Sequence, residues 1–71
     1  MIQGRKILGD NIRAQRKKKK LTIVQLAHKL KPDGDAYSHL SRIERGEIAC
    51  TIDTIWAIAV ALEVQPSTLL E

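Results

Sequence analysis

The residues best suited to chemistry form a short polar segment in the middle of the chain. Tyr37, Ser38, Ser41 and Arg42 carry hydrogen-bonding groups and lie within six residues of sequence. At about 100° per residue on a helix, they fan over the side opposite an apolar stripe. A helix that exposes small polar and arginine side chains after a tight turn is suited to the major groove of DNA. This segment is therefore the first candidate for a nucleic-acid-binding surface.

Catalytic and metal-binding patterns are weak in this sequence. Ser38 and His39 are neighbours, and on a helix their side chains point about 100° apart, so they cannot pair as nucleophile and base. His28, His39 and Cys50 follow one another at intervals of eleven residues, without the short spacings of metal sites. We expect no enzyme activity, no metal, no cofactor and no small-molecule ligand. The lone cysteine is expected to pack as a small apolar side chain.

The charge of the chain is unevenly distributed. The 71 residues include 12 basic and 8 acidic side chains, for a net charge of +4. Residues 1–31 hold ten basic residues and one acid, whereas residues 32–71 hold two basic residues and seven acids. This asymmetry indicates one face that meets a polyanion, with nucleic acid as the first candidate. The length fits a single domain over residues 1–71, with a core from about residue 6 to 70, and excludes large enzyme folds.

Composition also suggests where the protein works. The single cysteine excludes an intrachain disulfide. No apolar stretch approaches the roughly 18 residues that a membrane span needs. The N-terminus has no signal-peptide pattern. We therefore expect a soluble, cytoplasmic protein without membrane contacts.

Apolar residues recur at helical spacing along the chain, without the sustained alternation of a strand. The sequence predicts an all-α, compact five-helix domain. The first helix is expected from about residue 6 to 18, after which Leu21 turns inward. Thr22 and Gln25 match a capping box, so a second helix should begin here. The segment Lys31-Pro32-Asp33-Gly34 predicts the turn that ends it.

The remaining helices follow from their end signals. A third helix is expected over about Ala36–Arg45, capped by Asp35 and ended by Gly46. Thr51 should cap a fourth helix through about residue 62, and Pro66 should open a last turn. The expected core stripes of the four longer helices are Leu8, Ile12 and Gln15; Ile23, Leu26, Ala27 and Leu30; Ala36, Leu40 and Ile43; and Ile52, Ile55, Ile58, Ala59 and Leu62.

The order and spacing of these segments resemble the phage-repressor and Cro-type (XRE-like) helix-turn-helix family over roughly residues 8–70. The strongest single segment is Gly46 after Ile43-Glu44-Arg45. The resemblance implies a DNA-binding domain whose second and third helices form the helix-turn-helix. The other matching positions are Leu8-Gly9, Ile12-Arg13, Leu21-Thr22, Leu26-Ala27, Leu40-Ser41-Arg42, and Ile58-Ala59 with Ala61-Leu62.

The resemblance also implies roles for individual residues of the third helix. Arg42 is best suited to direct readout, because its guanidinium can bond guanine O6 and N7 together. Arg16 and Glu44 occupy positions that pair as a partly buried ion pair in the family, which would tie the first helix to the third. The positions that face base edges are Tyr37, Ser38, Ser41 and Arg42.

Phosphate contacts are a further role that the resemblance implies. The segment after the third helix would bind phosphate through an arginine and two backbone amides, and would fix register rather than sequence. The lysine run 17–20 would add contacts, although it fits a solvated helix end equally well. The candidates are Arg45, Gly46 and Glu47 in the first group, and Thr22, Lys19 and Lys20 in the second.

The chain departs from the family pattern at three places. The segment between residues 30 and 40 is about three residues longer than in the family. Ile23 stands where the family commonly has a glutamine that bonds phosphate, so packing but no hydrogen bond is expected there. Ala36 replaces the usual serine or threonine cap, and Asp35 is the expected substitute.

The fourth helix has more apolar surface than one core-facing stripe needs. Trp56 and Val60 lie beside its core stripe, and with Leu69 and Leu70 they predict a homodimer interface.

The resulting hypothesis is a sequence-specific DNA-binding transcriptional regulator, a repressor that binds a two-fold operator as a homodimer. It is similar in size to small phage regulators and to the controller proteins of restriction-modification systems. The half-sites should lie roughly 34–36 Å apart. One alternative is an antitoxin or bridging module that uses the same fold to bind a protein. Another is non-specific nucleic-acid binding through the lysine run.

Overall fold

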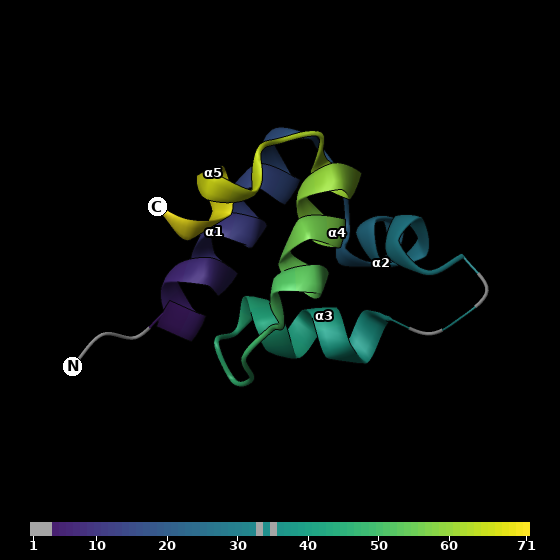
Figure 1. Ribbon diagram of the computed structural model, residues 1–71. Coiled ribbons are helices and arrows are strands. Elements are labelled where there is room, and N and C mark those ends of the chain that lie inside the picture. The colour runs from purple at the N-terminus through teal and green to yellow at the C-terminus, as the bar shows by residue number, and fades with distance from the viewer. Residues whose placement is uncertain (1–3, 33, 35) are drawn as a thin grey trace.

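The computed structural model describes residues 4–32, 34 and 36–71, and these residues form five helices (Figure 1). No strand forms in the described ranges. The expected all-α, five-helix fold is confirmed, and the first helix begins two residues earlier than expected. The helices are α1 (Gly4–Lys18), α2 (Ile23–Leu30), α3 (Tyr37–Glu44), α4 (Ile52–Leu62) and α5 (Pro66–Leu70).

The helices α2 and α4 begin where threonine side chains cap them. Thr22 Oγ1 accepts a hydrogen bond from the Gln25 amide at 3.1 Å, and Gln25 Oε1 accepts one from the Thr22 amide at 2.9 Å. This arrangement is the predicted capping box. Thr51 Oγ1 likewise accepts from the Thr54 amide at 3.2 Å, and Pro66 occupies the start of α5. Each cap supplies a partner to an amide that the helix itself leaves without one.

The two ends of α3 are held differently. At the start, Ala36 is the N-cap and makes no side-chain hydrogen bond to the helix. The expected cap, Asp35, lies outside the described residues. At the other end, Gly46 adopts a φ of 74°, which favours glycine, and the chain leaves the helix as predicted.

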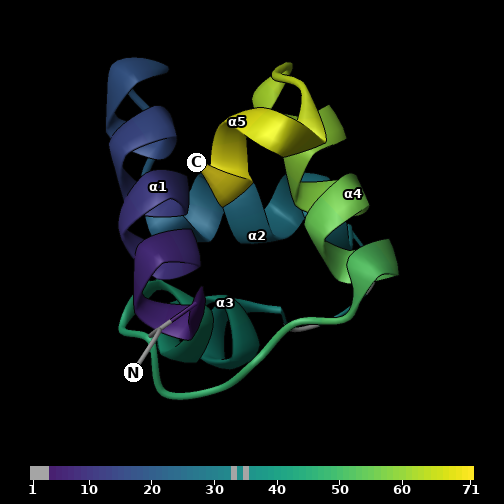
Figure 2. The same cartoon turned by 60° about the vertical axis from the view of Figure 1, so that its left-hand side comes forward.

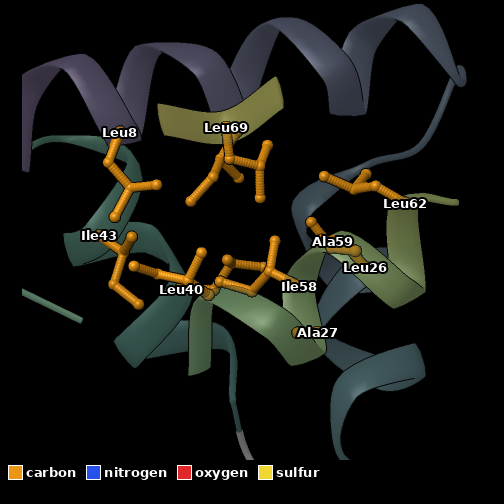
Figure 3. Close-up of a cluster of buried hydrophobic side chains, with 11 residues drawn as sticks. Leu8, Leu26, Ala27, Leu40, Ile43, Ile58, Ala59, Leu62 and Leu69 are labelled. Carbon is orange, nitrogen blue, oxygen red and sulfur yellow. The ribbon is translucent and has the colours of Figure 1, made fainter. Parts of the chain in front are cut away.

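One cluster of buried apolar side chains joins all five helices. Figure 3 shows Leu8 from α1, Leu40 from α3 and Leu69 from α5 pointing into the same space. Burial of this apolar surface is the main source of stability for so small a chain. The cluster consists of Leu8, Ile12, Leu26, Ala27, Leu40, Ile43, Ile55, Ile58, Ala59, Leu62 and Leu69.

Two expectations about apolar residues are wrong. Ile52 was expected in the core but is 65% exposed. It is the first residue of α4, where side chains point back past the helix start rather than over the following turns. Leu69 was expected at a dimer surface but is fully buried. Helix α5 packs against α1, and Asn11 Nδ2 donates a hydrogen bond to the Leu69 carbonyl at 3.0 Å.

Helices α1 and α3 approach each other closely at Gly9. A Cβ atom on this residue would lie 2.4 Å from the Ile43 carbonyl oxygen and 2.7 Å from that of Glu44. Figure 2 shows the start of α1 beside α3. The absence of a side chain at Gly9 therefore sets the distance between α1 and the helix that carries the polar segment.

Candidate nucleic-acid interface

Helix α3 has a buried side and a polar side. Leu40, Ile43 and Glu44 are buried against the rest of the protein. The opposite side carries the four residues expected to read bases. Of these, Tyr37, Ser38 and Arg42 are exposed and Ser41 is half-buried. The structure thus brings all four together on one short helix.

A buried ion pair fixes this helix from behind. Arg16 Nε donates to Glu44 Oε2 at 2.8 Å, and Arg16 Nη2 donates to Glu44 Oε1 at 3.0 Å. Arg16 Nη1 also donates to the Leu21 carbonyl at 2.8 Å. Both charged residues are less than a tenth exposed. Through these charge-assisted hydrogen bonds, Arg16 of α1 is joined both to α3 and to the segment between α1 and α2. The contact therefore orients the polar side of α3.

The segment after α3 differs from the expected phosphate site. The Gly46 amide donates to the Ile43 carbonyl, and the Glu47 amide donates to the Arg42 carbonyl, each at 3.0 Å. Both amides are therefore used to end the helix, which corrects the expectation that they bind phosphate. Arg45 Nε lies 3.0 Å from Glu47 Oε2, and both side chains are largely exposed. Such a surface pair is weak, so the Arg45 side chain can exchange its partner for a phosphate.

The second group of phosphate candidates lies between α1 and α2. Lys19 and Lys20 are exposed in the turn, and Lys20 has a positive φ of 58°. Thr22 is exposed at the N-cap of α2, where its hydroxyl already accepts from the helix. The three side chains are thus gathered at the start of α2.

A hollow of about 340 Å³ lies between α1 and α3, beside the Arg16–Glu44 pair. Four basic and two acidic side chains line it, for a formal charge of +2. Neither Lys6 nor Arg13 was expected from the sequence to contact nucleic acid. Both are on α1, and only the packing of α1 against α3 places them there. The other lining side chains are Asp10, Ile23, Ser41 and Arg45.

The outer side of α4 carries an exposed apolar stripe. Ile52, Trp56 and Val60 follow one another at intervals of four residues, and each is more than half exposed. Leu70 on α5 is also exposed, unlike the buried Leu69. Of the residues expected at a dimer interface, Trp56, Val60 and Leu70 are therefore on the surface.

The remaining reactive side chains do not form a site. His28 and His39 are exposed on different helices, and Cys50 is half-buried. Burial raises the pKa of the Cys50 thiol above its ordinary value. In the described part of the chain, no group of three or more metal-binding side chains is close enough to hold an ion. None of the described helices has the length and apolar character to cross a membrane.

Comparison with known proteins agrees with this geometry. Residues 12–69 match the helix-turn-helix family, a range that begins within α1 and ends within α5. Among solved structures, the chain is similar to the restriction-modification controller protein C.AhdI from Aeromonas hydrophila. The similarity has a TM-score of 0.82 and 28% sequence identity, and covers 92% of this chain and 94% of that chain. A search of curated proteins found no significant match.

Proposed function

This chain belongs to the helix-turn-helix family of DNA-binding transcription regulators, and we propose that it recognises one operator sequence as a homodimer. The observation that carries the proposal is the polar side of α3. Its buried side is held by the Arg16–Glu44 pair, and its other side presents hydrogen-bonding groups to solvent. A helix held in this way can enter the major groove without losing its orientation.

Base readout is assigned to four residues of α3. The Arg42 guanidinium bonds guanine O6 and N7, a contact that discriminates against other bases by about 1–3 kcal/mol. The hydroxyl groups of Ser38 and Ser41 donate to or accept from several bases, so they add less discrimination. Tyr37 contacts the base edges near the start of the helix.

Phosphate contacts would position this helix. The proposed groups are the Arg45 side chain and the exposed side chains at the start of α2. They bind every sequence alike and supply the part of the affinity that falls with salt. The residues in this second group are Lys19, Lys20 and Thr22.

The homodimer is proposed to form through α4. The exposed side chains of Trp56 and Val60 would be buried against the same surface of a second copy, as a two-fold interface requires. Leu70 lies at the edge of this interface. A small chain gains stability from burying a second apolar surface. Two recognition helices would then reach half-sites roughly 34–36 Å apart.

The regulatory role follows from this mode of binding. A dimer that occupies promoter DNA can block transcription by that occupancy alone, so we propose that the protein is a repressor. The similarity to a restriction-modification controller protein supports a role of that controller type. The concentration of the protein and the arrangement of its operators would set how strongly transcription is repressed.

The first test is selection of bound sequences from a random pool of double-stranded DNA, repeated across a salt series. We expect a two-fold motif with half-sites about one turn apart. Arg42→Ala should bind with little preference for that motif. Arg42→Lys keeps the charge but loses the two-pronged contact, so it should also lose much of the preference. Binding without a motif at any salt concentration would contradict a specific regulator and favour the lysine run or a protein partner.

The dimer has a separate test with a matched control. Val60 and Val24 are exposed to similar extents, 66% and 62%, but Val24 is on α2. Val60→Asp should shift sedimentation toward a monomer, because the charge would be buried in the interface. Val24→Asp should sediment like the unmodified protein. Equal sedimentation of both variants as dimers would exclude the α4 surface as the interface.

A further inference from the structure

The hollow between α1 and α3 adjoins the polar side of α3. Ser41 belongs to both, because it lines the hollow and lies next to Arg42 on the helix. Arg45, one turn further along, also lines it. A DNA strand that passes along the polar side of α3 therefore runs past the opening of this hollow.

The basic side chains of the hollow differ in whether they are paired. Lys6 Nζ lies 3.8 Å from Asp10 Oδ1, and Arg45 pairs with Glu47. Arg16 is committed to the buried Glu44. The Arg13 side chain forms no hydrogen bond or ion pair with any other residue in the ranges 4–32, 34 and 36–71.

The unpaired arginine lines a hollow whose side chains carry a net positive charge. The lining has a formal charge of +2, and the Ser41 hydroxyl is a second hydrogen-bond donor. The apolar side chain of Ile23 forms part of the wall and offers no hydrogen-bond donor. The volume of about 340 Å³ equals that of about eleven water molecules at roughly 30 Å³ each, so a phosphate group fits with water around it.

We propose that Arg13 binds a backbone phosphate of the DNA in the hollow between α1 and α3. This inference rests on the proposed DNA-binding function and adds a contact from a helix outside the helix-turn-helix. The planar guanidinium donates two hydrogen bonds to the phosphate oxygens. Because α1 is joined to α3 at Gly9 and through Arg16, a phosphate held by Arg13 fixes how far α3 enters the groove.

The test measures affinity for the selected operator duplex and for a random-sequence duplex across a salt series. Arg13→Ala should weaken binding to both by a similar factor of about tenfold. The slope of log affinity against log salt should fall in magnitude by about one. Arg13→Lys keeps the charge but loses the two-pronged contact, so its affinity should lie between those of Arg13→Ala and the unmodified protein.

Two further variants separate this site from a general effect of charge. Lys29→Ala removes the same charge from the other side of α2, and it should change affinity by less than about twofold. Asp10→Asn removes an anion from the hollow itself and should strengthen binding. Thermal melts of all variants show whether they remain folded.

The outcomes distinguish this inference from the proposed function. One outcome is that Arg13→Ala and Lys29→Ala weaken binding equally while Arg42→Ala still loses sequence preference. That result would show that Arg13 binds no phosphate, and it would leave the proposed sequence-specific regulator unaffected. An unchanged affinity in Asp10→Asn would also count against the hollow as the site. If the unmodified protein binds neither duplex, both the inference and the proposed function are wrong.

Discussion

Replacing Gly9 by alanine tests whether the close approach of α1 and α3 sets the position of the recognition helix. Two effects of the substitution oppose each other. Alanine favours helix over glycine by about 1 kcal/mol in a helix interior, so local propensity alone predicts a more stable protein. Packing predicts the opposite, because the new Cβ would lie 2.4 Å and 2.7 Å from two carbonyl oxygens.

The expected change in the free energy of unfolding depends on which atoms would have to move. Overpacking costs about 1–3 kcal/mol when side chains can rearrange. At Gly9 the obstacles are the backbone oxygens of Ile43 and Glu44, so we expect a cost near the upper limit, about 3 kcal/mol. After the gain in propensity, the net loss is about 2 kcal/mol. For a chain of this length that loss lowers the Tm by about 8–16 °C.

The assay is thermal and urea unfolding followed by circular dichroism, with Gly4→Ala as the control. Gly4 is on the same helix, and a Cβ there meets nothing within 4 Å. Its substitution should therefore change the free energy of unfolding by less than about 0.5 kcal/mol. A Gly9→Ala protein as stable as the control would refute the argument, because the distance between α1 and α3 would then not depend on the missing side chain.

The other predictions concern the buried ion pair and the cysteine. Glu44→Leu leaves the Arg16 guanidinium buried without its partner and should lower the free energy of unfolding by about 3–5 kcal/mol in urea titrations. The double variant Arg16→Met, Glu44→Leu should regain most of that stability, and a double variant no more stable than Glu44→Leu would contradict the pairing. Because burial raises the pKa of the Cys50 thiol, less thiolate is present at pH 7.5 in the folded than in the unfolded chain. Alkylation by iodoacetamide should therefore be slower in buffer than in urea and should accelerate as the pH rises, whereas equal rates would show that the thiol is not protected.

The helix ends could be predicted because their signals are local. The capping box of Thr22 and Gln25 and the cap at Thr51 each join residues three apart in the sequence. The left-handed Gly46 likewise needs only its own backbone and the preceding turn. For such features, the residues that determine the structure are already neighbours in the chain.

The core was predicted well where a helix is long enough to show a periodic pattern. The central residues of α4, Ile55 and Ile58, are buried as expected, whereas Ile52 at its first position is exposed. Leu69 was expected at the dimer interface together with Leu70. Helix α5 has five residues, fewer than two turns at about 3.6 residues each. No hydrophobic period can be detected over so short a segment.

The site was predicted in part for a similar reason. The polar side of α3 follows from the spacing of residues within one helix. The position of Arg13 does not, because the hollow that it lines exists only where α1, α3 and the start of α2 meet. The packing role of Gly9 could not be predicted either, since its close contacts are with Ile43 and Glu44, more than 30 residues away.

The burial of Leu69 has a consequence for the order of events during synthesis. The Leu69 side chain belongs to the same buried cluster as Leu8, and the Leu69 carbonyl accepts a hydrogen bond from Asn11, 58 residues earlier in the sequence. The core therefore cannot close until α5 has left the ribosome. At a synthesis rate of about 5–20 residues per second, Leu69 is added about 3–12 s after Asn11. The apolar side of α1 remains uncovered by α5 during that time. During that interval the exposed apolar surface of the nascent chain favours aggregation.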